Sequence, residues 1–339
     1  MARIAACLVT LVACLIVPPA AHAQNPNLIE YRGDVGPGSG KHVVLLAGDH
    51  EYRSEETLPM LARILARRYG FRCSVLVTTD PKTGFIEPGS SNIQGLDILR
   101  TADLLVVFLR FQDFPDAEMQ HIVDYLDRGG PVIGLRTATH AFQIQRPDAK
   151  FLKYTWKGIE GYPGGFGRQI LGETWVSHYG TNHKQSSALV VEPAQASHPI
   201  LRGVKDVWVE SGGYTADPMP GSIVLARGRI LNGMTPDSPP APDKQELPVA
   251  WTRTYRGASG REARVFTTTH GASEDLRNEG FRRMLVNAAL WAVGLESAIQ
   301  PANDVSLVGP YHPTTYSFGG FAKGVKPSDL AGWDTPIPR

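Results

Sequence analysis

Short apolar runs alternate with amphipathic stretches along the first half of the chain. The runs cover residues 42–47, 72–77, 103–109 and 131–135. Apolar positions with helical spacing follow the first run, from Leu58 to Leu65, and the third run, from Met119 to Leu126. Continuous apolar runs of this length are typical of buried parallel strands. The order strand, helix, strand, strand, helix, strand predicts an α/β fold, a doubly wound, mostly parallel sheet with helices on both faces.

The pattern is less regular in the second half. Residues from about 151 to 180 are rich in glycine and aromatic residues, and we expect them to form a long functional insertion that is a wall or lid of the site. Later strands are predicted at 188–191, 207–209, 223–226, 249–251 and 263–268. A last helix is predicted from about Glu274 to Val293, with its Arg282-Arg283 pair on a solvated face. After Gly294 the chain is rich in proline and glycine, which indicates either an ordered wrap or a floppy arm, and not a second domain.

The first residues have the pattern of an export signal. Arg3 precedes an apolar run, and Ala21-His22-Ala23 offers a small-x-small cleavage site, so the mature chain is expected to begin at Gln24, in the periplasm or outside the cell. The run is shorter than the roughly 20 apolar residues of a membrane-spanning helix. A lipoprotein-like box ending at Cys14 is the alternative. The predicted organisation is a signal peptide (1–23), a polar lead-in (24–40), an α/β domain (41–297) and a tail (298–339).

Charge and cysteine content narrow the choice of partners. Lys and Arg number 34 against 33 Asp and Glu, a balance that argues against nucleic acid as the main partner. Beyond the signal region only Cys73 remains, so no internal disulfide can form, and we expect this thiol to be buried. A homo-oligomer is compatible with these features.

Polar residues follow several predicted strands at their carboxyl ends. They are His50 and Glu51 after the first strand, Arg110 after the third, Arg136 and His140 after the fourth, and His270 after a late strand. Ligands of doubly wound sheets bind at this edge, so we expect these side chains around one pocket. The histidines and Glu51 suit proton transfer, and the two arginines suit substrate binding. His270→Ala is predicted to abolish turnover or ligand binding while leaving stability nearly intact.

Two further pairs are candidate substrate-binding residues. Glu210 and Tyr214 flank a Gly-Gly turn, where a carboxylate and a phenol suit recognition of sugar hydroxyls. His178 and His183 lie in a predicted loop at a spacing that permits a shared metal, although loop histidines also serve as hydrogen-bonding groups. The metal ligands are therefore unknown, no cofactor is certain, and a divalent metal stays open.

Each candidate has a structural alternative. His50 and Glu51 can be the polar cap of a helix, and Arg136 can hold a buried aspartate or the tail. His140 can be a helix-surface histidine bonded to a carbonyl, and Glu210 can be a solvated turn residue. Aromatic residues such as Trp175 can stack on sugar faces or simply fill the core.

The segment Gly130-Pro131-Val132-Ile133-Gly134-Leu135-Arg136-Thr137-Ala138 resembles the strand-to-helix elbow of class I glutamine amidotransferases. In those enzymes a cysteine follows Gly-x at the turn, and here Arg136 occupies that place. A guanidinium stays protonated and cannot attack an acyl group, so no glutaminase activity is expected.

Downstream motifs resemble the ThuA-like family. They are His198-Pro199-Ile200, Trp208-Val209-Glu210-Ser211-Gly212-Gly213-Tyr214, Pro248-Val249-Ala250-Trp251, the stretch 264–271 and the stretch 281–292. The resemblance covers most of 42–294. Many ThuA-like proteins carry histidine where this chain has Arg136, so the chain is similar to an exported subgroup, and a histidine-based metal site is in doubt.

The family is linked to the use of trehalose and related sugars. The resemblance therefore implies a small-molecule sugar substrate, in its oxidised (keto) form. Three hypotheses follow. The first is an enzyme, a hydrolase, lyase or isomerase, that acts on a sugar or keto glycoside by acid–base chemistry. The second is a non-catalytic carbohydrate-binding protein on the same frame. The third is a metal-dependent hydrolase that uses the clustered histidines.

Overall fold

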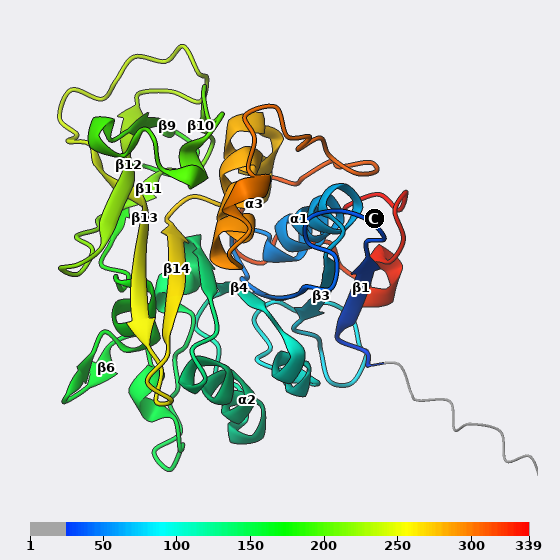
Figure 1. The fold of residues 1–339 in the computed structure, drawn as a ribbon. Helices are drawn as coiled ribbons and strands as arrows, with labels where there is room; N and C mark the ends of the chain where they lie inside the picture. Colours follow the sequence, from blue (N-terminus) through cyan, green and yellow to red (C-terminus); the bar gives the residue numbers. More distant parts are fainter. Residues whose placement is uncertain (1–24, 339) are drawn as a thin grey trace, which may run out of the picture.

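A ten-stranded mixed sheet forms the centre of the molecule, with the strand order β1-β3-β2-β4-β5-β14-β13-β12-β9-β10 (Figure 1). The computed structural model describes residues 25–338, so the predicted signal peptide and its cleavage site lie outside the described residues. The predicted class, a mostly parallel α/β sheet of the flavodoxin or glutamine amidotransferase type, is confirmed. In the part of the chain that is described, the helices are too short or too polar to cross a membrane.

The parallel strands carry the apolar runs of the sequence. They are β2 (His42–Gly48), β3 (Arg72–Val77), β4 (Leu104–Leu109), β5 (Val132–Leu135) and β14 (Glu262–Thr268). Every residue of β2, β4 and β5 is buried, as expected for strands that are covered on both faces. Their carboxyl ends meet at one edge of the sheet, which we call the rim.

Antiparallel strands extend the sheet on both sides. They are β1 (Leu28–Arg32) next to β3, and β13 (Leu247–Arg256), β12 (Ile223–Leu231), β9 (Ser186–Val191) and β10 (Trp208–Val209) beyond β14. The polar lead-in, for which the sequence predicts no regular structure, contributes β1. Its alternating burial marks an edge strand with one solvated face.

Helices cover both faces of the sheet. α1 (Ser54–Tyr69) and α3 (Glu279–Ala292) lie on one face, and α2 (Asp116–Asp127) lies on the other (Figure 1). Short helices are η1 (Leu96–Thr101), η2 (Arg136–His140), η3 (Leu152–Tyr154), η5 (Pro193–Gln195), η6 (Pro199–Leu201), η7 (Ser273–Arg277), η8 (Glu296–Ala298) and η9 (Pro327–Leu330). The predicted last helix is divided at Asn278, which is extended and whose side chain caps α3 by accepting from the Phe281 amide.

The glycine-rich insertion forms several short elements. They are β6 (Gly158–Ile159), β7 (Tyr162–Pro163), the π-helix η4 (Gly167–Leu171) and β8 (His178–Tyr179), which pairs with β11 (Gly213–Tyr214). Through β8 the insertion reaches the rim, and Trp175 packs there against His140, with ring centroids 5.3 Å apart.

The tail is an ordered wrap across α1 and α3. Its apolar residues Val305, Val308, Tyr311, Tyr316, Leu330 and Ile337 belong to the same core as these helices. Arg63 of α1 donates to the carbonyls of Val308, Leu330 and Thr335. The prediction of a solvated Arg282-Arg283 pair is wrong, because both are buried and donate to the tail carbonyls of Val305 and Asn303.

Candidate functional site

The turn after β2 is fixed by a buried aspartate. The Asp49 carboxylate accepts the backbone N–H groups of Glu51 and Tyr52 and the hydroxyl of Thr137. Thr137 belongs to the turn after β5, so a single carboxylate ties two strand ends together. This bond sets the positions of His50, Glu51 and Tyr52 on the rim.

Arg110 connects the first and third strand ends, as the sequence predicts. Its Nη1 lies 2.7 Å from His50 Nε2, and its Nη2 lies 3.6 Å from Glu51 Oε2. Because arginine can only donate, His50 accepts at Nε2 and carries its proton on Nδ1, which has no partner among the described residues. Burial raises the pKa of the Glu51 carboxyl despite the nearby Arg110, and burial together with Arg110 lowers the pKa of His50.

A second hydrogen-bond chain starts at Tyr52. The Asn182 amide donates to the Tyr52 oxygen at 3.0 Å, so the Tyr52 hydroxyl is free to donate to His178 Nε2, also at 3.0 Å. Burial and the charges of Arg136 and Arg110 lower the pKa of His178 to about 4. His178 is therefore neutral at physiological pH.

Arg136 is a buried residue that contacts several segments at the rim. It is the first residue after β5 and has a positive φ of 44°, an uncommon conformation for a residue other than glycine. Its Nη1 donates to the carbonyls of Gly212 at 2.7 Å and Thr269 at 2.8 Å. Its guanidinium carbon lies 3.8 Å from the Tyr52 ring centroid and 4.8 Å from that of Tyr214. The side chain is fully buried and supports neighbouring loops through Nη1, while its Nε and Nη2 have no hydrogen-bond partner among the described residues.

His140 lies on the same side of the rim and is buried among aromatic rings, so it is no helix-surface histidine. Its ring is 4.8 Å from Phe111 and 5.9 Å from Tyr214, and its Nδ1 is 3.2 Å from the Thr139 hydroxyl. Burial and nearby cations lower its pKa well below the usual value, so the ring is neutral. We call the connected set His50, Glu51, Tyr52, Arg110, Arg136, His140, His178 and Tyr214 the rim cluster.

His270 follows β14 but lies in the interior. It is fully buried, neither ring nitrogen has a hydrogen-bond partner in the described chain, and its nearest ring neighbour is Phe281 at 6.4 Å. Burial, with a contribution from Arg136, lowers its pKa to about 3. A side chain this enclosed contributes to packing, so the predicted small effect of His270→Ala on stability does not fit its position.

The loop candidates are separated. Tyr214 lies in the rim cluster, 5.5 Å from the His178 ring. Glu210 instead lies 3.5 Å from Arg277 and close to Glu274, and burial and that second carboxylate raise its pKa to about 7. His183 stacks on Tyr316 at 4.3 Å, whereas His178 accepts from the Tyr52 hydroxyl. Among residues 25–338, no group of three or more His, Cys, Asp and Glu can hold a metal ion.

Sequence reasoning misses the contribution of the tail to the rim. The Phe318 ring lies 5.6 Å from the His50 ring, and Tyr316 packs on Tyr52 at 4.9 Å. The available signal is the motif Ser317-Phe318-Gly319-Gly320, in which a large aromatic residue stands in a glycine-rich turn without a helical or strand period.

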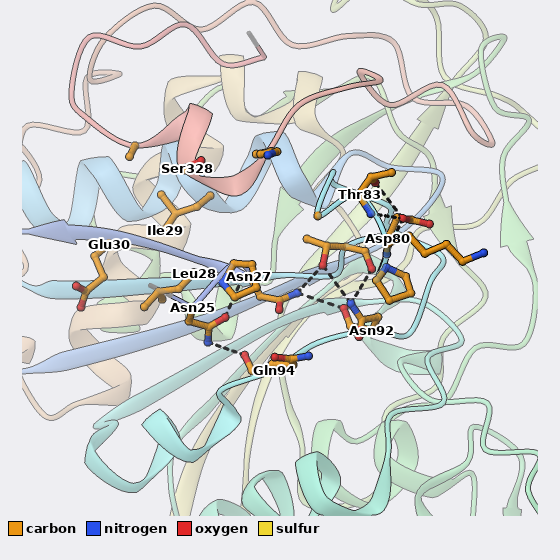
Figure 2. A pocket seen from close by; sticks show the side chains of 17 residues that line it. Asn25, Asn27, Leu28, Ile29, Glu30, Asp80, Thr83, Asn92, Gln94 and Ser328 are labelled. Carbon is orange, nitrogen blue, oxygen red and sulfur yellow. Dashed lines mark hydrogen bonds between the residues drawn. The ribbon is translucent and has the colours of Figure 1, made fainter. Parts of the chain in front are cut away.

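A separate cavity of about 630 Å³ lies where β1 begins and β3 ends (Figure 2). Asn27 spans its wall by donating to the carbonyl of Val77, and the Asp80 carboxylate is occupied by its own turn, with Thr83 as a donor. The described residues that line it include no histidine and no arginine. The cavity therefore offers lysines and carboxylates, including Glu30 and Asp80, but not the imidazole and guanidinium groups of the rim cluster.

The chain is similar to two solved structures and to one sequence family. A ThuA-like protein from Bacteroides uniformis superposes with a TM-score of 0.45 at 14% identity, covering 84% of this chain and 98% of that chain. A ThuA-like protein from Parabacteroides merdae gives 0.40 at 16% identity, covering 82% of this chain and 96% of that chain. No curated protein matches the sequence. The sequence profile of the ThuA family, described as trehalose utilisation, matches residues 43–292. Because this match spans most of the chain, the protein is a member of the ThuA family.

Proposed function

We propose that this ThuA-family protein acts on an oxidised (keto) glycoside by acid–base chemistry at the rim cluster, after export from the cytoplasm. The observation that carries the proposal is the arrangement of Glu51 and His50 on one guanidinium, that of Arg110. Burial raises the pKa of the Glu51 carboxyl above its usual 4.5, towards the range in which a carboxylate is an effective general base. Burial and Arg110 lower the pKa of His50, which favours a neutral imidazole that can donate a hydrogen bond.

Their hydrogen bonds suggest which group does what. Glu51 Oε2 has no hydrogen-bond partner in the described chain, so an ionised Glu51 can accept a proton from substrate. The His50 lone pair is used by Arg110, so His50 offers its Nδ1–H as a donor to a carbonyl oxygen. A carboxylate base beside a neutral imidazole donor suits removal of a proton from the carbon next to a ketone. An isomerase or lyase acting on a keto sugar uses this step.

The experiment is proton exchange in deuterated water. Wild-type protein is incubated with 3-keto glucosides and with the parent glucosides, and deuterium incorporation next to the carbonyl is followed by NMR. We expect exchange only in the keto sugars, a loss of at least about 100-fold in Glu51→Gln, and a rate that rises with pH through a midpoint above the usual pKa of 4.5. Exchange that is unchanged in Glu51→Gln contradicts the assignment.

A non-catalytic sugar-binding protein is the second candidate. It is favoured by His140 and His178, which burial keeps neutral and which pack against the Trp175 ring as hydrogen-bonding groups. Sugar binding without exchange or turnover is the result expected from this alternative. The metal-dependent hydrolase gains no support from the histidine arrangement in residues 25–338.

A further inference from the structure

An aromatic ring of the tail stands exposed beside the rim cluster. The Phe318 side chain is 62% exposed, although most phenylalanines of this chain lie in the core. The guanidinium carbon of Arg110 lies 4.8 Å from the Phe318 ring centroid and 4.8 Å from that of Phe111. The guanidinium is therefore held by two rings, of which the Phe318 ring is open to solvent.

The segment that carries Phe318 is tightly fixed. The Gly319 amide donates to the His50 carbonyl at 3.0 Å. The fully buried Arg53 donates to the carbonyls of Thr315 and Ser317 and to the Ser317 hydroxyl. A Cβ at Gly320 would lie 2.1 Å from the Arg53 guanidinium, so a larger residue here would displace the Arg53 side chain from its tail contacts. These contacts hold the ring in place before any ligand arrives, which lowers the entropic cost of binding.

We propose that Phe318 is a stacking platform for a pyranose ring, and that it determines specificity at the rim cluster. The inference rests on the proposed function and names its substrate class as cyclic glycosides with equatorial hydroxyls. Such a ring has a face of C–H bonds that can cover an aromatic ring, while its edge carries the hydroxyls. On this site the edge would face His50, whose ring centroid lies 5.6 Å from that of Phe318. An apolar surface with a few placed polar groups is the general form of small-molecule sites.

The test is binding of methyl glucoside, its 3-keto form and the open-chain polyol glucitol, measured by calorimetry with full-length protein. Phe318→Ala is expected to weaken binding of the cyclic sugars about tenfold, and Phe318→Trp is expected to restore it. Binding of glucitol should be weak in all variants. The control is Phe85→Ala, which removes another exposed phenylalanine, 36% exposed, that also faces a cation, Lys326.

A side chain this exposed contributes little to stability, so the melting temperature of Phe318→Ala should match that of wild type. Loss of binding in this variant would therefore not be caused by unfolding. If Phe318→Ala and wild type bind the cyclic sugars with equal affinity, the stacking role of Phe318 is refuted, even if proton exchange supports the proposed function. Tight binding that depends on Phe318 without exchange in wild type supports the platform and refutes the acid–base chemistry. If wild type binds no pyranoside, both are refuted.

Discussion

The buried His270 should make the free energy of unfolding fall as the pH is lowered. In the folded chain burial lowers its pKa to about 3, against 6.5 for an exposed histidine. As pH falls below 6.5, the unfolded chain binds a proton at this position and the folded chain does not, so stability is lost with falling pH until about pH 3. One pKa unit corresponds to about 1.4 kcal/mol, so this residue alone lowers the free energy of unfolding by about 2 kcal/mol between pH 7.5 and pH 5.

The matched comparison is His270→Leu, which has a similar volume and does not titrate. Because neither ring nitrogen of His270 has a partner in the described chain, the substitution breaks no hydrogen bond, and the variant should be at least as stable as wild type at pH 7.5. The free energies of unfolding of both proteins are measured in urea at pH 7.5 and pH 5, and their difference cancels the contributions of the other titrating groups. The stability gap should widen by about 2 kcal/mol in favour of the variant at pH 5. A gap that does not change with pH would mean that the folded protein protonates His270 normally and that its ring is not enclosed.

Three other predictions concern the tail, the elbow and the N-terminus. Arg53→Leu should remove the donors that hold the tail, so it should destabilise the fold by about 2 kcal/mol or more and expose the tail to limited proteolysis. The control Arg100→Leu changes an exposed arginine and should have neither effect, and equal protease resistance of both variants would contradict the role of Arg53. Glutaminase activity should be absent because an arginine occupies the elbow, and ammonia release from glutamine that is lost in Cys73→Ser would show the opposite. N-terminal sequencing of the exported protein should find Gln24, and a lipidated Cys14 would show that the alternative reading of the signal is correct.

The parallel core of the fold could be predicted because its strands are mostly apolar. The runs that became β2, β4 and β5 have no polar face, and β3 has polar residues only at Arg72 and Ser74, so their burial between helices follows from the sequence. β1 was missed because a short edge strand takes its pairing from β3 and has little apolar pattern of its own. Local pattern carries little information about such long-range pairing.

Strand ends also explain what could be predicted of the site. His50, Arg110, Arg136 and His140 meet because parallel strands share one carboxyl edge. The local sequence does not determine how deeply a side chain at a strand end is buried, so the burial of His270 could not be predicted. Contacts made by irregular segments, such as that of Phe318, depend on the path of the whole tail.

The wrap of the tail has a consequence for the order in which the protein can fold during synthesis. The Tyr31 hydroxyl in the first strand donates to the carbonyl of Leu330, 299 residues later. Arg53, which precedes α1, and Arg63 within α1 are buried only when tail carbonyls from 308 to 335 reach them. A nascent chain that lacks its last residues must keep these guanidinium groups hydrated, and the apolar surface of α1 stays open with them. We therefore expect the native packing of α1 to form only once the tail through Thr335 is available, and a chain that stops before this segment to be cut more readily by proteases.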